Sequence, residues 1–360
     1  MRTGAGISLL AAFFLCSCAT QQRTAAAISV SFETDEAVAV LKILDKRANR
    51  EPITPGDWAD LFKTEGYVRL KEREHAMGRK FEEDIFRDFV MSDELLSRRA
   101  MLHETLTDWA NMDVTQAAQL ALRYLPANAR IAATVYPVIK PATNSFVYDI
   151  QRDPAIFVYV ETLPRDTLEA IVAHELHHVG YASSCGQSAT VASAPLPAPL
   201  QDLQQWLSAF GEGIATVAAA GGPTFQPRLK PDALAEWHRQ ANHLRENFDA
   251  AQAFLQSVAR GELTDEAQQQ KGMQLFGIVG PWYTVGWHMA EVIEQEMGRD
   301  AVIHAFCDQR TLLGTYNDAA SRRAARTGET LPLWETGLVR VFESRETPAD
   351  VVKAQCGRPA

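Results

Sequence analysis

The chain has 360 residues, of which 46% are hydrophobic and 22% are charged, and its net charge is −10. This length and composition are typical of a globular protein with one large domain or two. The negative charge argues against a nucleic-acid backbone or an anionic membrane surface as partner, because both would repel it.

The first residues, MRTGAGISLLAAFFLCSC, predict an export signal. Arg2 gives it a positive start, and the apolar core from Ile7 to Leu15 is too short to span a bilayer as a mature helix. The core ends in Leu15-Cys16-Ser17-Cys18, which resembles a bacterial lipobox. We therefore expect a lipoprotein signal peptide over residues 1–17 and a lipid on Cys18. An ordinary signal, cleaved after a small residue, is the alternative.

A lipid on Cys18 predicts a membrane anchor made of acyl chains, followed by a polar tether over residues 18–30. Ala19 stands where an aspartate would often retain a lipoprotein in the inner membrane. We therefore expect an envelope lipoprotein of the outer membrane that faces the periplasm.

Three cysteines remain beyond the signal, namely Cys185, Cys307 and Cys356. They permit one disulfide in an oxidising envelope, but the sequence does not tell which pair forms it. They lack CxxC spacing, which argues against a structural zinc knuckle.

The hydrophobic pattern along the chain is helical, then strand-rich, then helical again. SVSFETDEAVAVLKIL predicts a short strand that runs into a helix, and the pattern stays helical to about residue 125. Segments 131–138, 144–150 and 155–161 are rich in β-branched and aromatic residues, so we expect strands joined by hairpins. A helix should begin near Pro164 and end near Gly180, followed by a loop over 182–200 and by further helices.

This pattern predicts an α+β fold that is mainly helical, with a small β-sheet before the helix over 165–180. We expect a mainly helical N-terminal region over residues 31–125 and a catalytic region over 126–360.

The sequence HELHH at 174–178 matches the H-E-x-x-H zinc motif. On a helix, His174 and His178 lie one turn apart on the same face, so both imidazoles can bind one Zn²⁺ ion. Glu175 points away from them, where it can act as general base on a water without ligating the metal. His177 falls on the other flank, as a residue of the surface or one that supports the ligands. Histidines buried in an ordinary helical core are the alternative.

A catalytic zinc site needs a third protein ligand, and Glu212 in FGEGIAT is the best candidate. It is the only charged residue from Leu203 to Pro227. The small residues Ser208, Ala215 and Ala219 flank it, which predicts a second buried face that the zinc helix approaches closely. A lone surface glutamate is the alternative, and the fallback ligands are His238, His243, His288 and His304.

HELHH followed by EGIAT resembles the gluzincin metallopeptidases. More narrowly, the chain resembles an uncharacterised family of proposed zinc-dependent peptidases of bacterial envelopes, over most of its length, including a late Tyr-x-x-Gly segment. The resemblance implies a zincin-like fold, a His₂Glu zinc site and peptide-bond hydrolysis. One departure is the 33-residue separation of His178 from Glu212, which is longer than in the compact gluzincins.

The late segment, GPWYTVGWHMAEVIEQEMG over residues 280–298, supplies two further candidates. Zincin sites usually add a donor that stabilises the oxyanion, and Tyr283 and His288 stand near the start of this predicted helix. Packing in the core is the alternative for both. The sequence thus predicts a zinc metallopeptidase with a peptide or protein substrate and no nucleic-acid partner. A non-catalytic zinc-binding scaffold and a non-peptide hydrolase stay open.

Overall fold

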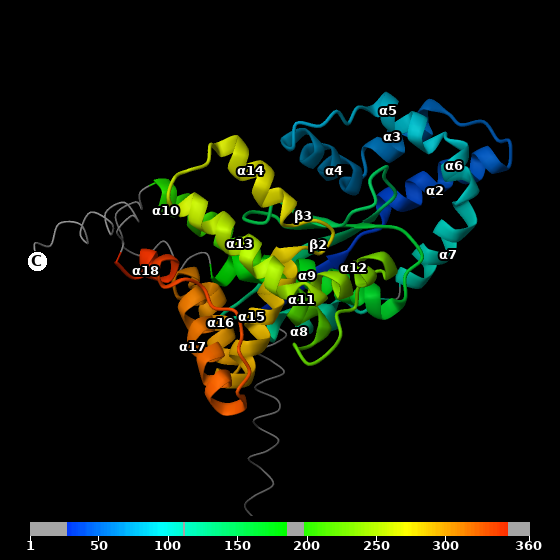
Figure 1. The fold of residues 1–360 in the computed structure, drawn as a ribbon. Coiled ribbons are helices and arrows are strands. Elements are labelled where there is room, and N and C mark those ends of the chain that lie inside the picture. The colour runs from blue at the N-terminus through cyan, green and yellow to red at the C-terminus, as the bar shows by residue number, and fades with distance from the viewer. Residues whose placement is uncertain (1–26, 111, 186–197, 345–360) are drawn as a thin grey trace, which may run out of the picture.

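The structure is a computed structural model that describes residues 27–110, 112–185 and 198–344 (Figure 1). The predicted signal peptide, Cys18, Cys356 and most of the predicted loop over 182–200 lie outside these ranges. Within them, no helix is both long enough and apolar enough to cross a membrane.

A four-stranded sheet of order β1-β2-β4-β3 lies near the middle of the molecule (Figure 1). Its strands are β1 (Ile28–Phe32), β2 (Ile131–Val138), β3 (Phe146–Tyr148) and β4 (Ala155–Tyr159). All four strands were predicted, but the expected hairpin between β2 and β3 is wrong. β4 is buried along its whole length, so it pairs on both sides: parallel with β2 and antiparallel with β3. The short, half-exposed β3 is thereby left at the edge.

Helices dominate the chain on either side of the sheet, as the sequence predicts. Those before it are α2 (Asp35–Ala48), α3 (Pro55–Phe62), α4 (Glu65–Ala76), α5 (Glu83–Val90), α6 (Asp93–Ser97), α7 (Arg99–Trp109) and α8 (Val114–Leu122). Those after it are α9 (Arg165–Ser184), α10 (Ala198–Leu207), the 3₁₀ turn η1 (Ser208–Phe210), α11 (Gly211–Ala220), α12 (Pro231–Asn242), α13 (Leu244–Ala259), α14 (Asp265–Gln274), α15 (Pro281–Met297), α16 (Arg299–Cys307), α17 (Gln309–Thr327) and α18 (Thr336–Ser344). The predicted α+β fold class, mainly helical with a small sheet before α9, is confirmed.

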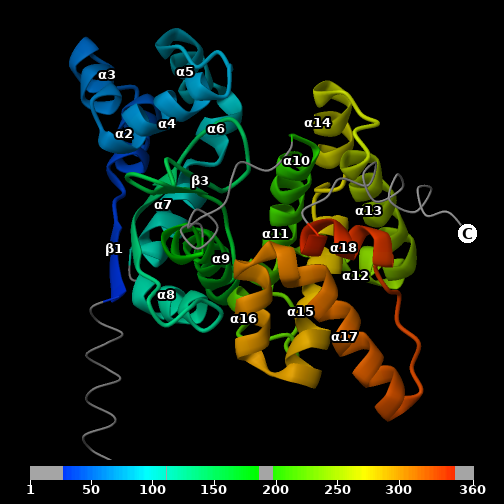
Figure 2. The same cartoon turned by 90° about the vertical axis from the view of Figure 1, so that its left-hand side faces the viewer.

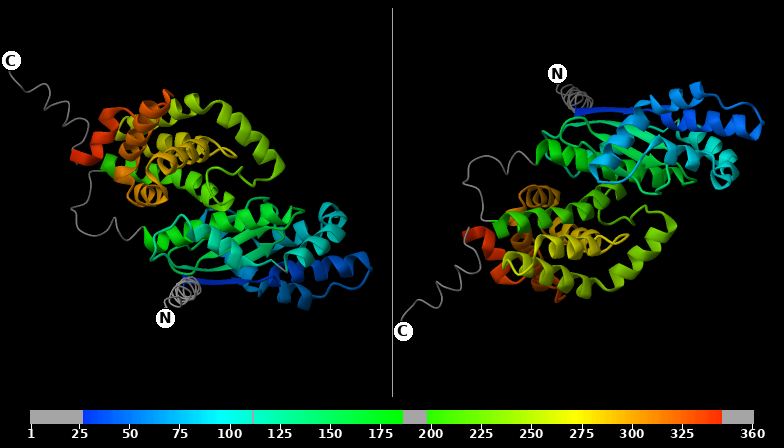
Figure 3. Two further views of the ribbon diagram at one scale, coloured as in Figure 1. Left: turned by 90° about the horizontal axis from the view of Figure 1, so that it is seen from below. Right: turned by 90° about the horizontal axis from the view of Figure 1, so that it is seen from above.

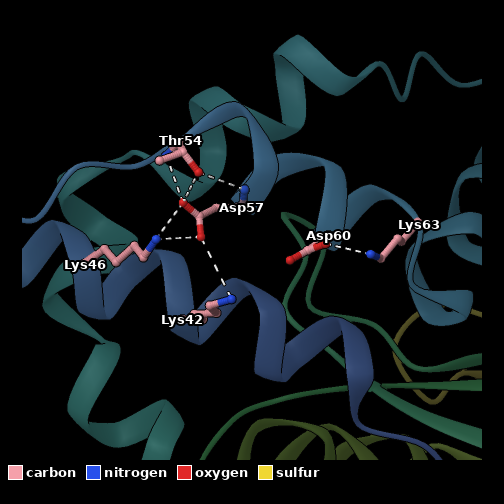
Figure 4. A network of polar contacts seen from close by, with 6 residues as sticks. All are labelled: Lys42, Lys46, Thr54, Asp57, Asp60 and Lys63. Atoms are coloured by element: carbon pink, nitrogen blue, oxygen red, sulfur yellow. Dashed lines mark hydrogen bonds and ion pairs between the residues drawn. The ribbon is translucent and has the colours of Figure 1, made fainter.

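A capping box begins α3 and also joins it to α2 (Figure 4). The Thr54 hydroxyl accepts a hydrogen bond from the Asp57 amide at 3.4 Å, and the Asp57 carboxylate accepts one from the Thr54 amide at 2.8 Å. Lys46 of α2 donates to both carboxylate oxygens of Asp57 at 2.7 Å. These hydrogen bonds, that from Lys46 first, lower the pKa of Asp57. The carboxylate therefore stays charged and fixes α3 on α2.

Helix α9 begins after Pro164, as predicted, but it does not end at Gly180. A Cβ on Gly180 would lie 2.3 Å from Leu125 Cδ1, so the glycine lets α9 pack closely on the chain before β2. The prediction is wrong because this glycine provides space within the helix and does not cap it. Helix α9 continues for one further turn to Ser184.

The buried residues form two clusters that divide the molecule into two lobes, side by side in Figure 2 and in both views of Figure 3. The N-terminal lobe, residues 27–185, packs its helices around the sheet, and the C-terminal lobe, residues 198–344, is entirely helical. Ala219 of α11 belongs to the first cluster and Tyr124 to the second, so the two cores interlock where the lobes meet. The predicted division into regions 31–125 and 126–360 stays a prediction.

Among the contacts that join α9 and the chain before the sheet to the C-terminal lobe are two hydrogen bonds and a disulfide. Tyr124 Oη donates to Glu294 Oε2 at 2.7 Å, and Tyr181 Oη donates to the Phe306 carbonyl at 2.9 Å. A disulfide links Cys185, at the end of α9, to Cys307, at the end of α16. The structure thus supplies the cysteine pairing that the sequence left open.

Candidate active site

Helix α9 places His174 and His178 on one face, one turn apart. Their Nε2 atoms lie 3.1 Å from each other, and the rings meet edge to face with centroids 4.8 Å apart. The helix is fixed by the apolar residues Leu168, Val172, Leu176 and Val179, which are buried in the N-terminal core. Both imidazoles therefore project from a rigid element toward the C-terminal lobe.

Helix α11 brings Glu212 to these two histidines. Glu212 Oε2 lies 3.0 Å from His174 Nε2 and 3.5 Å from His178 Nε2. Every residue of α11 from Gly213 to Ala220 is buried, because the helix packs on α9 on one side and on α15 on the other. The small residues beside Glu212 thus form the second buried face that the sequence predicts.

The three converging atoms fit a zinc ion. Zinc in proteins takes bonds of about 2.0–2.1 Å to histidine nitrogen, which in a tetrahedral site places neighbouring donors about 3.3 Å apart. The three separations here, 3.0, 3.1 and 3.5 Å, bracket that value. Two imidazoles and one carboxylate are also the donor set of many catalytic zinc sites. In the part of the chain that the structure describes, no other cluster of histidine, cysteine and acidic side chains fits a metal.

The charge state of these side chains shows how strongly they interact. Burial opposes the charge on Glu212, but the neighbouring His178 and His174 outweigh it and hold the pKa of the carboxyl well below its usual value. Burial likewise opposes the charge on His178, while Glu212 raises the pKa of that imidazole to about 9. Glu212 is therefore ionised, as a metal ligand must be.

Thr216, one turn after Glu212, fixes the orientation of His174. Its hydroxyl donates its single proton to the Glu212 carbonyl at 2.8 Å. At His174 Nδ1, 3.4 Å away, the hydroxyl can therefore only accept. With the ring proton on Nδ1, Nε2 is the atom that can bind a metal ion placed between the three side chains. The sequence analysis missed this role, although the spacing of Glu212 and Thr216 in EGIAT contains the signal.

Glu175 lines a pocket that opens beside the three candidate ligands. The pocket has a volume of about 750 Å³, including the part open to solvent. Burial raises the pKa of Glu175, and the nearby His174 and His178 oppose this. The wall consists of Ser145, Ala170, Ile171, His174, Glu175, Thr216, Ala219, Arg228, Leu229, Lys230, Ala233, Ile278, Val279 and Tyr283.

Tyr283, near the start of α15, lies against the same site. Its ring stacks on that of His174 with centroids 6.3 Å apart, and it lines the pocket. Burial raises the pKa of its hydroxyl well above the usual value, and the carboxylates of Glu212 and Glu175 raise it further. The phenol is therefore protonated at neutral pH and can donate a hydrogen bond into the pocket.

Two glycines let α11 and α15 cross closely enough to bring Glu212 and Tyr283 together. A Cβ on Gly213 would lie 2.3 Å from the Trp287 amide nitrogen, and one on Gly286 would lie 2.6 Å from the Phe210 carbonyl. These glycines follow Glu212 directly and Tyr283 by three positions. The sequence analysis quoted both motifs but missed this steric role, which depends on the helix crossing.

The remaining histidines lie away from this site. His288 does not line the pocket; its ring meets that of Tyr316 with centroids 5.9 Å apart, and burial lowers its pKa to about 4. The structure therefore does not bring it to the oxyanion position considered above. His238, His243 and His304 are exposed.

His177 is buried, so placing it at the surface is wrong, while the supporting role is consistent with its contacts. Its Nε2 lies 3.3 Å from the Tyr124 carbonyl, and burial lowers its pKa to about 3. It is packed because α9 is covered on this flank by the chain before β2.

The comparisons with known proteins agree with this geometry. No curated protein and no solved structure matches the chain. A family model described as "Putative zinc dependent peptidase (DUF5700)" matches residues 58–325, which include His174, Glu175, His178, Glu212 and Tyr283. Because the match covers most of the chain, the protein belongs to this family.

Proposed function

We propose that the protein is a zinc metallopeptidase of the gluzincin type, which hydrolyses peptide bonds in the bacterial cell envelope. The observation that carries this proposal is the meeting of His174, His178 and Glu212 across the two lobes, with Glu175 in the adjoining pocket. The family to which the chain belongs supports the same reading.

Zinc, when bound by these three residues, supplies Lewis-acid activation of the water and of the scissile carbonyl. Glu175 takes a proton from the attacking water and passes it to the nitrogen of the leaving amine. Its raised pKa suits the first transfer, because a carboxylate of higher pKa is a stronger base toward the water. Thr216 keeps the His174 ring in the tautomer that can ligate.

Tyr283 stabilises the negative charge that develops on the carbonyl oxygen during attack. Its hydroxyl is protonated at neutral pH and the ring is held against His174, so the donor is positioned before the reaction begins. His288 has no part in this mechanism, because it does not line the pocket.

Metal analysis and a cleavage assay on the purified protein test the proposal. We expect about one zinc per chain and chelator-sensitive cleavage of a peptide library. His174→Ala and His178→Ala should each lose the zinc, because nothing nearby replaces the lost donor. His304→Ala is the matched control, since this exposed histidine lies outside the candidate site, and it should keep zinc and activity. Full zinc occupancy in both ligand variants would contradict the assignment.

A non-catalytic zinc-binding envelope scaffold is the second candidate function. Glu175→Gln separates the two, because loss of cleavage with retained zinc supports the enzyme. Bound zinc without turnover on any peptide favours the scaffold.

Attachment to the outer membrane through a lipid on Cys18 is a separate proposal, which rests on the lipobox-like sequence. Cys18→Ala should release the protein from the detergent phase into the aqueous phase during phase separation. A variant still bound to membranes would contradict the lipid anchor.

A further inference from the structure

The wall of the pocket carries two cations, Arg228 and Lys230, whose role the proposed mechanism leaves open. Both belong to the segment between α11 and α12, and they face a pocket whose other charged groups are at the candidate active site. A role for this pair rests on the proposed function and concerns a chemical feature of the substrate.

Both cations are held by contacts across the junction of the lobes. Arg228 Nη2 donates to the Ala219 carbonyl at 2.5 Å, and Nη1 lies 3.5 Å from Glu169 Oε2 on α9. Lys230 Nζ pairs with the Glu161 carboxylate and lies 3.4 Å from the Thr143 carbonyl. Neither acidic partner, Glu169 or Glu161, lines the pocket.

Neither the guanidinium of Arg228 nor the ammonium of Lys230 uses all its N–H donors in these contacts. A guanidinium has five N–H groups and an ammonium has three. Arg228 Nε is buried and has no hydrogen-bond partner in the described structure. Nη1 and Nη2 carry two N–H groups each and make one contact each, so donors remain on a residue that lines the pocket, where a substrate acceptor can use them. A carboxylate is the best match for a guanidinium, since it accepts two parallel hydrogen bonds.

The positions of Glu169 and Ala219, which contact Arg228, indicate how far its guanidinium lies from the reacting bond. Glu169 precedes His174 on α9 by about one and a half turns, and Ala219 follows Glu212 on α11 by about two turns. At 1.5 Å per residue these offsets correspond to roughly 8–10 Å along the helices. An extended peptide covers about 3.3 Å per residue. Arg228, which contacts both helices, therefore lies within reach of a group roughly two to three residues from the scissile bond, and Lys230 follows it by two positions on the same pocket wall.

The pocket wall between the candidate zinc ligands and the two cations is formed by apolar side chains, several of them small. Ala170, Ile171 and Ala219 line it from α9 and α11, with Leu229 and Ala233 on the facing segment. Such a wall admits small or apolar side chains and offers few polar groups on the way. Recognition by charge is thus concentrated at Arg228 and Lys230.

We propose that Arg228 and Lys230 form an anion subsite that binds a carboxylate of the substrate peptide two to three residues from the scissile bond. The carboxylate is either the free C-terminus or an acidic side chain, and both sources share the chemistry of the subsite.

Matched peptides distinguish the two sources. A short peptide library is prepared as free acids and as C-terminal amides, with glutamate or glutamine at each internal position. Preference for free acids assigns the C-terminal carboxylate, and preference for internal glutamate assigns a side chain. Arg228→Gln should reduce the preferred-to-neutral ratio of kcat/KM by roughly 10- to 100-fold, as expected for the loss of a charge-assisted hydrogen bond. Lys230→Gln should act in the same direction.

Two further variants guard against a merely structural effect. Arg228→Lys keeps the charge and should restore part of the preference. Arg260→Gln breaks an ion pair with Glu262 outside the pocket and should leave the preference unchanged. Should Arg228→Gln fail to fold, Lys230→Gln carries the same test. Equal losses for charged and neutral peptides, or an unchanged ratio in both glutamine variants, would overturn the subsite.

A binding assay separates this inference from the proposed function. Zinc-loaded Glu175→Gln protein is titrated by calorimetry with acid and amide forms of the same peptides. Tighter binding of the carboxylate forms, weakened by Arg228→Gln, supports the subsite even if the native protein cleaves nothing. The absence of cleavage would then count against the peptidase alone. Equal binding of both forms would overturn the subsite whether or not cleavage is seen.

Discussion

The two lobes are built on different principles. The N-terminal lobe depends on contacts between distant parts of the chain, since β1 pairs with β2 across about a hundred residues. Its core surrounds a sheet. The C-terminal lobe packs helices on one another, and its core includes many aromatic residues, among them Trp206, Phe210, Trp237, Phe248, Phe254, Trp282, Trp287, Tyr316 and Trp334. Aromatic rings also pack on the sheet, where Phe157 of β4 lies against Tyr136 of β2 and Phe146 of β3, so the lobes differ in topology more than in the kind of side chain that fills them.

This difference matters because the candidate site uses both lobes. His174, Glu175 and His178 come from α9, which is anchored in the sheet-based core. Glu212, Thr216 and Tyr283 come from α11 and α15, which pack mainly in the helical core of the C-terminal lobe. Neither lobe alone holds three candidate ligands. Changes at the junction should therefore affect the metal, while changes deep in one lobe should affect stability first.

The largest effect should come from removing the ligand that the C-terminal lobe contributes. Glu212→Gln keeps the shape of the side chain but removes its charge, so we expect zinc binding and peptide cleavage both to fall by orders of magnitude. Glu175→Gln is the matched control on α9. It should lower cleavage by about 10²- to 10⁴-fold, as for the loss of a general base, while zinc stays bound. Metal content and kcat/KM are measured together. A Glu212→Gln protein with full zinc and full activity would show that another residue is the third ligand.

The next effect should come from cutting the covalent link between the lobes. Cys185→Ser with Cys307→Ser opens a loop closed by residues 122 positions apart, and the loss of such a link costs about 2–5 kcal/mol of unfolding free energy. Because Cys185 ends the helix that carries His174 and His178, zinc affinity should fall as well. Urea unfolding and zinc titration measure both effects. Wild-type protein kept in reductant is the control and should match the double variant. Unchanged stability in both would show that the link is not formed in solution.

Local patterns allowed much of the molecule to be predicted. The enrichment in β-branched and aromatic residues predicted all three strands of the segment before α9, and the spacing of His174 and His178 predicted their common face. The lone charge among small residues predicted a buried position for Glu212. Each of these inferences depends on residues within one or two turns of each other, where the periodicity of helix or strand fixes the geometry.

What escaped prediction depends on partners far away in the chain. Gly180 lies within α9 because Leu125 packs against it, and no sequence neighbour reveals that contact. The parallel pairing of β2 with β4 and the choice of Cys307 as the partner of Cys185 are likewise decided by the tertiary fold. Of the two positions predicted for His177, the surface one is wrong because its coverage by the chain at Tyr124 comes from outside the helix.

A smaller effect should follow from separating the helices at the junction. Gly213→Ala places a methyl group 2.3 Å from the Trp287 backbone nitrogen, so α11 must move away from α15. We expect a loss of about 1–3 kcal/mol in unfolding free energy and weaker zinc binding, because Glu212 moves with the helix. Gly211→Ala is the matched control on the same helix. Nothing lies within 4 Å of its added methyl group, so it should be neutral or stabilise by up to about 1 kcal/mol. Equal results for the two variants would rule out the close crossing.

The smallest effect, when measured at low pH, should come from replacing Glu36 of α2, which is buried deep in the N-terminal lobe. Its side chain is 1% exposed, Oε2 accepts a hydrogen bond from the Ile139 amide at 2.9 Å, and burial raises its pKa to about 8 from 4.5. The folded protein thus keeps the proton on Glu36 at a pH where the unfolded chain releases it. The stability that this proton contributes is complete below about pH 4.5 and is lost as the pH rises to about 8.

Glu36→Gln holds a neutral side chain of the same shape at every pH. At pH 5 we expect its unfolding free energy to lie within about 1 kcal/mol of the wild type, because both side chains are then uncharged in the fold. As the pH rises toward 8 the wild type should lose stability relative to the variant, since only the wild type is ionised in the unfolded state. Zinc binding should stay the same, because the residue lies in one lobe and away from the junction. Urea unfolding at pH 5 and at pH 8 measures the difference in unfolding free energy between the wild type and the variant. The exposed Glu104→Gln is the control. A gap that does not widen with pH would show that Glu36 is ionised in the folded protein.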